Sequence, residues 1–103
     1  MDTNKEIPVI LYGPAGSGKT YTARNMVKAI GKIPLEANIN ENSNLRNLNP
    51  SKCLIMEEFS GFEDIVTFHH IISKAWHNKM FYTTQADLKG IETNEFNLIE
   101  CKF

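Results

Sequence analysis

A lysine and a threonine directly follow three closely spaced glycines near the start of the chain. The stretch reads Gly13, Pro14, Ala15, Gly16, Ser17, Gly18, Lys19 and Thr20, and it matches G-x-x-x-x-G-K-[ST] at every fixed position. The glycines let the backbone curl so that successive N–H groups point at one anion, and a helix behind them adds its positive dipole end. In this pattern the lysine reaches the β- and γ-phosphates, and the threonine hydroxyl ligates Mg²⁺. The glycine-rich loop (residues 13–20) therefore predicts a site for ATP with Mg²⁺.

Two adjacent carboxylates, Glu57 and Glu58, follow an apolar run at residues 53–56. An apolar strand that ends in carboxylates delivers them to the C-terminal edge of a sheet, where open α/β sheets bind ligands. Glu57 would hold Mg²⁺, directly or through water, and Glu58 would polarise the attacking water. The alternative is a strand that ends by chance in two solvated glutamates, but the glycine-rich loop upstream favours the site.

The segments around these residues are expected to form strands and helices that position them. An apolar run at residues 7–12 predicts a strand buried on both faces. The expected helices span residues 21–30 and 63–76, and further strands are expected at 33–39, 53–58, 80–82 and 96–103. The apolar face of the first helix comprises Ala23, Met26, Val27 and Ile30, and that of the second comprises Ile65, Phe68, Ile72, Ala75 and Trp76.

Turn-forming residues mark the ends of several expected elements. Gly31 suits the position just after the first helix, and Asn78 can cap the second. Pro34 predicts that strand 33–39 lies at an edge of the sheet. Residues 38–49 contain six asparagines and predict a loop, with one helical turn around residues 45–48.

The composition predicts one domain, residues 1–103, with enough apolar residues for a core. Hydrophobic residues make up 42% of the chain, and its formal net charge is −1. The chain has only two arginines, Arg24 and Arg46, and no basic stripe, so it shows no nucleic-acid surface although such binding stays open. No signal peptide and no long apolar span is present, which predicts a cytoplasmic protein without a membrane role.

The cysteines and histidines form no recognisable metal pattern. Cys53 and Cys101 have neither metal-binding spacing nor the pattern of a disulfide framework. His69, His70 and His77 lie on or beside helix 63–76, and two of them are seven residues apart and could share a face. A metal site would still need further ligands, so a solvated or packed role is expected for them.

The order of the glycine-rich loop, an apolar strand with two acids and a later strand tip resembles the AAA+ and superfamily-three helicase branch of P-loop ATPases. The stretch at residues 12–20 is also similar to the start of small stand-alone P-loop proteins of phages. This resemblance implies a three-layer α/β core, the P-loop NTPase core, without a lid domain. It implies a five-stranded, mainly parallel sheet in the order 5-1-4-3-2 with helices on both faces. On that order Cys53 and Cys101 lie on non-neighbouring strands and cannot bond.

The resemblance also assigns a polar residue at the tip of strand 80–82. In the family such a side chain lies between the catalytic glutamate and the γ-phosphate, which makes Gln85 and Thr84 the candidates here. The alternative is an ordinary strand end, where Thr and Gln are common. The residues implied to converge on the phosphates are the catalytic Lys19, Glu58 and Gln85 and the metal-binding Thr20 and Glu57.

Four departures from the family pattern stand out. Glu57 replaces the usual Asp, Gln85 replaces the usual Asn, and the lid domain is missing. Glu95 stands where the family often has an arginine that reaches into a neighbour's active site, and no arginine follows Arg46. Such an arginine contributes about 10³–10⁵ in rate. Hydrolysis is therefore expected to be slow unless Lys89, Arg46 or a partner substitutes.

The sequence thus predicts an ATP-binding P-loop NTPase, a slow Mg²⁺-dependent ATPase linked by resemblance to phage or plasmid DNA replication. A nucleotide-gated binding module is the alternative, which would dock on a larger AAA+ helicase or loader and modulate or block it. Glu95 favours that alternative because it would repel a neighbour's phosphates. A small nucleotide kinase is a weaker alternative because no arginine-rich lid is visible. A protein partner or a homo-oligomer is expected in the first two cases.

Overall fold

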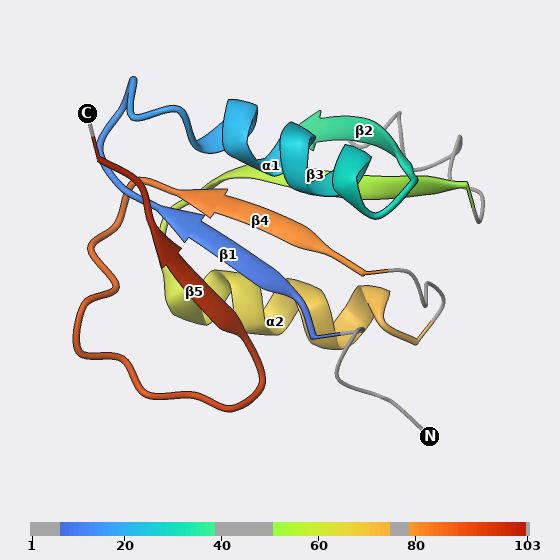
Figure 1. The fold of residues 1–103 in the computed structure, drawn as a ribbon. Helices are drawn as coiled ribbons and strands as arrows, with labels where there is room; N and C mark the ends of the chain where they lie inside the picture. The colour runs from blue at the N-terminus through green and yellow to red at the C-terminus, as the bar shows by residue number, and fades with distance from the viewer. Residues whose placement is uncertain (1–6, 39–50, 75–78, 103) are drawn as a thin grey trace.

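The computed structural model describes residues 7–38, 51–74 and 79–102, and within these ranges it has five strands and two helices (Figure 1). The elements are β1 (Val9–Tyr12), α1 (Lys19–Ala29), β2 (Ile33–Asn38), β3 (Lys52–Phe59), α2 (Phe62–Ile72), β4 (Phe81–Thr84) and β5 (Asn97–Glu100). The five strands form one sheet in the order β2-β3-β4-β1-β5, and every pairing in it is parallel. Read from its other edge, this order is 5-1-4-3-2.

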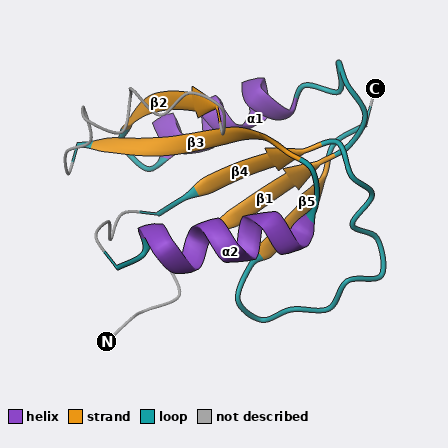
Figure 2. Cartoon of the chain, turned by 180° about the vertical axis from the view of Figure 1, so that it is seen from behind, coloured by secondary structure: helices purple, strands orange, loops and turns teal. Residues whose placement is uncertain are grey.

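The two helices cover opposite faces of the sheet, and each face has its own apolar cluster (Figure 2). Val9 and Leu11 of β1 pack with α1, in a cluster that includes Val27. Ile10 and Tyr12 point to the opposite face of the sheet and belong to the apolar cluster that α2 covers. Because strand side chains alternate, a strand buried on both faces reads as a continuous apolar run, and β1 is buried at every position.

Helix α1 begins two positions earlier than the periodicity suggests, so Lys19 and Thr20 form its first turn. It ends in the Schellman arrangement: Gly31 N–H bonds to the Lys28 carbonyl at 3.0 Å, and Lys32 N–H bonds to the Val27 carbonyl at 3.2 Å. Gly31 takes the left-handed conformation with φ 79°, as expected for this position. Ile30 was expected on the buried face, but this was wrong. It is the capping residue beyond the last turn, and it is 48% exposed.

Strand β2 is the edge strand that Pro34 predicts, and it pairs with β3 alone. Arg24 of α1 donates to both carboxylate oxygens of Glu36 in β2, from Nε to Oε2 and from Nη2 to Oε1, with Nη2 and Oε1 2.9 Å apart. The expected helical turn in the loop that follows, like Arg46, lies outside the described residues.

Helix α2 presents Ile65 to the core, with Phe68 and Ile72 packed around it. It ends at Ile72, where Ser73 N–H bonds to the His69 carbonyl at 2.9 Å. The remaining residues predicted for this helix and its cap, Ala75, Trp76, His77 and Asn78, lie outside the described residues. No helix in the described ranges is long and apolar enough to cross a membrane.

The two cysteines are free, as expected, although both are buried in the cluster on the α1 face. Cys53 lies in β3 and Cys101 follows β5, and two strands separate them in the sheet. The thiols therefore serve as small apolar groups of the core.

Candidate functional site

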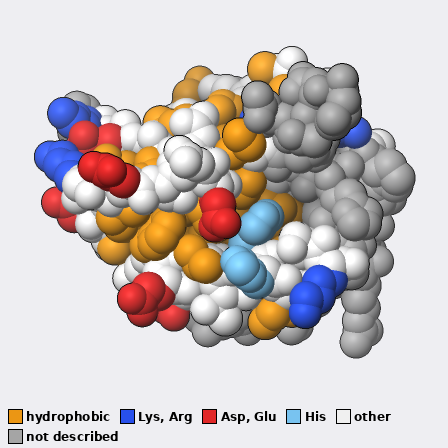
Figure 3. Space-filling model, turned by 90° about the horizontal axis from the view of Figure 1, so that it is seen from below, with side chains coloured by type: hydrophobic (Ala, Val, Ile, Leu, Met, Phe, Trp, Pro, Cys, Tyr) orange, Lys and Arg blue, Asp and Glu red, His pale blue; other side chains and the backbone are white. Residues whose placement is uncertain are grey.

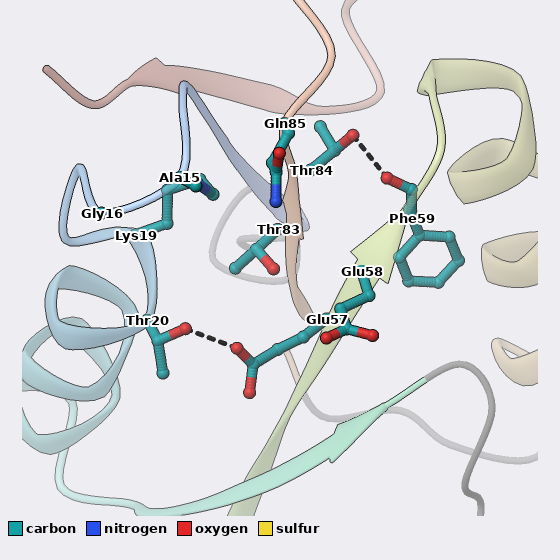
Figure 4. A pocket seen from close by; sticks show the side chains of 10 residues that line it. All are labelled: Ala15, Gly16, Lys19, Thr20, Glu57, Glu58, Phe59, Thr83, Thr84 and Gln85. Carbon is teal, nitrogen blue, oxygen red and sulfur yellow. Dashed lines mark hydrogen bonds between the residues drawn. The ribbon is translucent and has the colours of Figure 1, made fainter.

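One cavity of about 460 Å³ opens at the C-terminal edge of the sheet (Figure 4). It is lined by Ala15, Gly16, Lys19, Thr20, Glu57, Glu58, Phe59, Thr83, Thr84 and Gln85. These residues come from the segments that follow β1, from the end of β3 and from the end of β4. The cavity brings together every residue that the sequence assigned to catalysis or metal binding. The other four residues of the glycine-rich loop, Gly13, Pro14, Ser17 and Gly18, do not line it.

The start of the glycine-rich loop is pressed against the end of β5. The Gly13 N–H bonds to the Thr84 carbonyl at 3.2 Å, and the Cys101 N–H bonds to the Tyr12 carbonyl at 2.8 Å. A Cβ atom at Gly13 would lie 2.2 Å from the Cys101 carbonyl oxygen, and φ there is 153°. Only glycine fits this close approach, so β1, β4 and β5 together determine where the loop leaves the sheet.

The other end of the loop leads directly into α1. Gly18 is the N-cap residue of this helix, and no side chain caps it. The backbone N–H groups of the first turn are therefore directed at the loop without a side-chain acceptor. Ser17 Oγ lies within the loop as a buried hydroxyl without a hydrogen-bond partner. These donors and the helix dipole suit an anion held inside the loop.

Lys19 folds over the loop from the first turn of α1. Its Nζ donates to the Gly13 carbonyl at 3.0 Å and to the Pro14 carbonyl at 2.8 Å. An ammonium has three donors, so these two bonds leave one for a further acceptor. The lysine thereby places a positive charge at the mouth of the cavity.

Thr20 and Glu57 meet across the cavity (Figure 4). Thr20 Oγ1 donates to Glu57 Oε1 at 2.5 Å, which joins α1 to β3. A hydroxyl and a carboxylate in contact are two hard oxygen ligands of the kind that Mg²⁺ takes from proteins, together with waters and substrate phosphates. Both residues predicted to bind the metal are thus adjacent to each other.

Glu58 enters the same cavity because β3 is irregular at this point. Met56 pairs with Tyr82 and Phe59 pairs with Thr84, so β3 has one residue more than β4 over this interval. Glu58 has φ 69°, and it is the one non-glycine residue with a positive φ in the described ranges. In a regular strand two neighbouring side chains would face opposite sides of the sheet. The bulge instead turns both carboxylates toward the cavity.

Asn38 at the end of β2 holds the second carboxylate. Its Nδ2 donates to Glu58 Oε2 at 2.6 Å. This amide had not been predicted as part of the site, because nothing in the sequence shows that β2 ends beside the bulge of β3. The contact fixes the orientation of Glu58 from the opposite side to the loop.

The tip of β4 contributes differently from what the resemblance implied. Thr84 is 1% exposed, and its hydroxyl donates to the Phe59 carbonyl at 2.7 Å and accepts from the Ala86 N–H at 3.2 Å. It therefore supports the bulge of β3, and this use of its only proton argues against a role toward phosphate. The Gln85 side chain is directed toward the middle of the cavity (Figure 4).

Thr83 is a cavity residue that the sequence reasoning missed. Its Cα pairs with that of Leu11, and it follows Phe81 by two positions, so it faces the same side as α1. Thr84 faces the opposite side, where α2 lies. The alternation of side chains along residues 81–84, combined with the burial of Phe81 against α1, was the signal that could have found it.

The charged residues of the cavity are one lysine and two glutamates. A triphosphate entering it would meet Glu57 and Glu58 as well as Lys19. A divalent cation between these carboxylates and the phosphates would remove the repulsion. Among the described residues no group of three or more His, Cys, Asp or Glu could hold a metal by itself, so such a cation would need substrate oxygens.

The remaining residues named by the sequence lie away from this cavity. Lys89 Nζ lies 3.3 Å from Glu100 Oε2 and does not line it. Arg24 forms an ion pair with Glu36 at the solvent-exposed surface. Neither cation contacts the glycine-rich loop in the interactions of the described residues.

Glu95 borders a separate groove on the α2 side, seen from below in Figure 3. Ile7, Pro8 and Phe96 form its apolar part, and His69, His70, Ser73 and Lys74 form its other wall. His69 Nδ1 lies 2.7 Å from the Tyr82 hydroxyl, and partial burial lowers the pKa of His69. These contacts give His69 the packed role expected of it.

Neither a protein-family model nor a curated protein matches the chain, so the arrangement of the residues themselves carries the functional argument.

Proposed function

We propose that the chain is a P-loop NTPase that binds ATP with Mg²⁺ in this cavity and hydrolyses it slowly. The observation that carries the proposal is the contact between Thr20 and Glu57 at the mouth of a loop over which Lys19 is folded. It brings the two oxygen ligands expected for Mg²⁺ next to the ammonium expected for the phosphates. An accidental glycine-rich turn would not require a carboxylate from β3 at this place.

The residues present fit the group that would bind. The unpartnered Ser17 hydroxyl and the uncapped N-terminus of α1 offer donors to phosphate oxygens. Bound Mg²⁺ would supply positive charge that neutralises the phosphates. Thr20 and Glu57 are the residues that would hold it, because both already present oxygen atoms on the same side of the cavity.

The chain's own groups have distinct tasks in this proposal. Lys19 would exchange a loop carbonyl for a phosphate oxygen, since its two present bonds are to exposed or half-buried carbonyl groups. Glu58, oriented by Asn38, would accept a hydrogen bond from the attacking water. The side chains of Thr83 and Gln85 border the same space and would position the γ-phosphate or the water. By resemblance of its motifs, the reaction is proposed to serve phage or plasmid DNA replication.

Binding is tested with Lys19→Ala, and chemistry with Glu58→Gln. ATP affinity, measured by calorimetry with Mg²⁺, should fall at least about 100-fold in Lys19→Ala, because charge-assisted bonds to phosphate are lost. Lys28→Ala on the exposed side of the same helix is the matched control and should bind as the wild type does. Unchanged affinity in Lys19→Ala would rule out the proposed site.

The rate of phosphate release should fall by a factor of about 10²–10⁴ in Glu58→Gln, because a positioned base is lost. ATP binding should be retained. Glu63→Gln at the exposed start of α2 is the control for the loss of a carboxylate. Tight binding of ATP with no turnover by the wild type would favour the nucleotide-gated binding module instead. Phosphate transfer to an added nucleoside monophosphate would favour the kinase.

A further inference from the structure

A second, smaller cavity of about 240 Å³ adjoins the first one beside the glycine-rich loop. It is lined by Tyr12, Gly13, Pro14, Gln85, Asp87, Lys89 and Glu100. Gln85 lines both cavities, and the loop supplies Gly13 and Pro14 to one and Ala15 and Gly16 to the other. The side chain of Gln85 and the glycine-rich loop therefore border both spaces.

Lys89 is placed in this second cavity by contacts at both of its ends. Its backbone N–H donates to Asp87 Oδ1 at 3.0 Å, which shapes the segment after β4. Its Nζ lies 3.3 Å from Glu100 Oε2, and Glu100 is the Cα partner of Tyr12, the residue before the loop. The hydrogen bond and the charge of Glu100 raise the pKa of Lys89, so the side chain stays an ammonium.

The ion pair between Lys89 and Glu100 is weak enough to dissociate. The Lys89 side chain is 62% exposed, and exposed ion pairs are weak because water and salt screen them. Lys102 Nζ lies 3.8 Å from the other oxygen of Glu100, so the carboxylate would keep a cation if Lys89 left. A triphosphate in the neighbouring cavity would attract the free ammonium more strongly than a single shared carboxylate.

We propose that Lys89 is a catalytic lysine, which moves from Glu100 to the γ-phosphate of bound ATP and supplies the positive charge that the arginine-free cavity lacks. The inference rests on the proposed nucleotide site. A water oxygen forms the new bond to the γ-phosphorus, and the bond from that phosphorus to the β–γ bridging oxygen breaks. The bridging electron pair stays on ADP, and the water gives a proton to Glu58. Lys89 donates a hydrogen bond to a γ-oxygen throughout and transfers no proton.

The test compares three variants with the wild type: Lys89→Ala, Lys89→Arg and, as the matched control, Lys102→Ala. The control also removes a cation from Glu100 but lies outside the second cavity. The kcat for phosphate release should fall about 10- to 100-fold in Lys89→Ala, as for the loss of one transition-state donor. It should be largely restored in Lys89→Arg, and in Lys102→Ala it should fall much less than in Lys89→Ala.

Affinities for ADP and for the slowly hydrolysed analogue ATPγS separate this role from a structural one. Lys89→Ala should weaken ATPγS binding and leave ADP binding unchanged, because ADP has no γ-phosphate. Equal loss for both nucleotides, or equal kcat in Lys89→Ala and Lys102→Ala, would overturn the inference while the nucleotide site stands. Failure of the wild type to bind either nucleotide would overturn the proposed function as well. If the wild type binds both nucleotides without turnover, the ratio of the ATPγS and ADP affinities in Lys89→Ala, compared with that in the wild type, decides whether Lys89 contacts the γ-phosphate.

Discussion

Glu58 combines a proposed catalytic side chain with an unfavourable backbone conformation. Left-handed φ and ψ angles bring the Cβ atom of a non-glycine residue close to a carbonyl oxygen, which costs about 1–2 kcal/mol. Glu58 nevertheless adopts φ 69° at the bulge of β3. Such strain persists where the surrounding structure enforces it, and it is concentrated at functional sites. Here the enforcing groups are Thr84, which binds the Phe59 carbonyl, and Asn38, which binds the carboxylate.

Replacing Glu58 by Gly and by Ala separates the strain from the carboxylate. Both variants lose the side chain and its bond to Asn38, but only glycine adopts the left-handed conformation without cost. The Gly variant should therefore be about 1 kcal/mol more stable than the Ala variant in urea unfolding. Both should lose turnover. Equal stability of the two variants would show that the backbone at residue 58 is not strained.

The residue scale also shows what the sequence could and could not reveal. The spacing of the glycine-rich loop was enough to name Lys19 and Thr20 as candidates, and both line the cavity. The position of Thr83 in the cavity could have been predicted from the alternation of side chains along β4. The bulge could not have been predicted, because the positive φ of Glu58 follows from the pairing of β3 with β4 and not from its own residue type. Asn38 depends on the same pairing and was missed for the same reason.

At the scale of elements, α2 holds its face of the sheet with aromatic contacts. His69 packs edge-on against Tyr82 and Phe96, with ring centroids 5.7 and 5.3 Å away. Tyr82 in turn packs on Phe59, the residue that follows Glu58, at 5.5 Å. The packing of α2 therefore extends to the strand end that carries Glu58, the proposed catalytic carboxylate.

The stability of this packing should depend on pH through His69. Burial lowers its pKa below the ordinary value of 6.5; the charge of His70 lowers it further, and Glu95 opposes the shift. The unfolded chain thus binds a proton more readily than the folded chain. The resulting stability is present above pH 6.5 and is lost as the pH falls through the folded-state pKa. Thermal unfolding between pH 5 and 8 should show this fall.

The matched control for this titration is the neighbouring histidine. His69→Gln should flatten the pH dependence of the unfolding temperature, whereas His70→Gln, on the exposed side of the same helix, should largely keep it. A pH profile that is equally steep in His69→Gln would show that another group is responsible.

Element boundaries were predictable where one local rule decides them. Gly31 ends α1, and Pro34 marks β2 as an edge strand, because each imposes its own backbone restriction. Ile30 was misassigned because the apolar spacing continues past the last turn of α1, and spacing alone does not show where a helix stops. The helical residues proposed after Lys74 lie outside the described ranges, so that part of the prediction stays open.

At the scale of the whole molecule, both lysines proposed to contact the phosphates belong to the chain that binds the nucleotide. Hydrolysis should then need no second copy. Turnover per mole of protein should be independent of protein concentration, and light scattering should give the monomer mass with and without ATP. Activity that rises with concentration, together with a larger mass, would show that a neighbouring copy completes the site.

Glu95→Arg provides the sharper form of this test. It places an arginine where the resembled family often has one that acts on a neighbour, and Glu95 lies in a groove that shares no lining residue with the cavity. In a monomer the substitution should leave turnover unchanged. A gain of activity would reveal contact between copies of the chain at the proposed site.

The approach of Cys101 to Gly13 has a consequence for how the chain folds. The loop motif is short and local, yet its starting point is set by a carbonyl from the far end of the sequence. Contacts between residues so distant along a chain form late, since closing a long loop costs entropy before it is rewarded. During synthesis the glycine-rich loop would thus emerge early from the ribosome but reach the conformation described here only after β5 has docked.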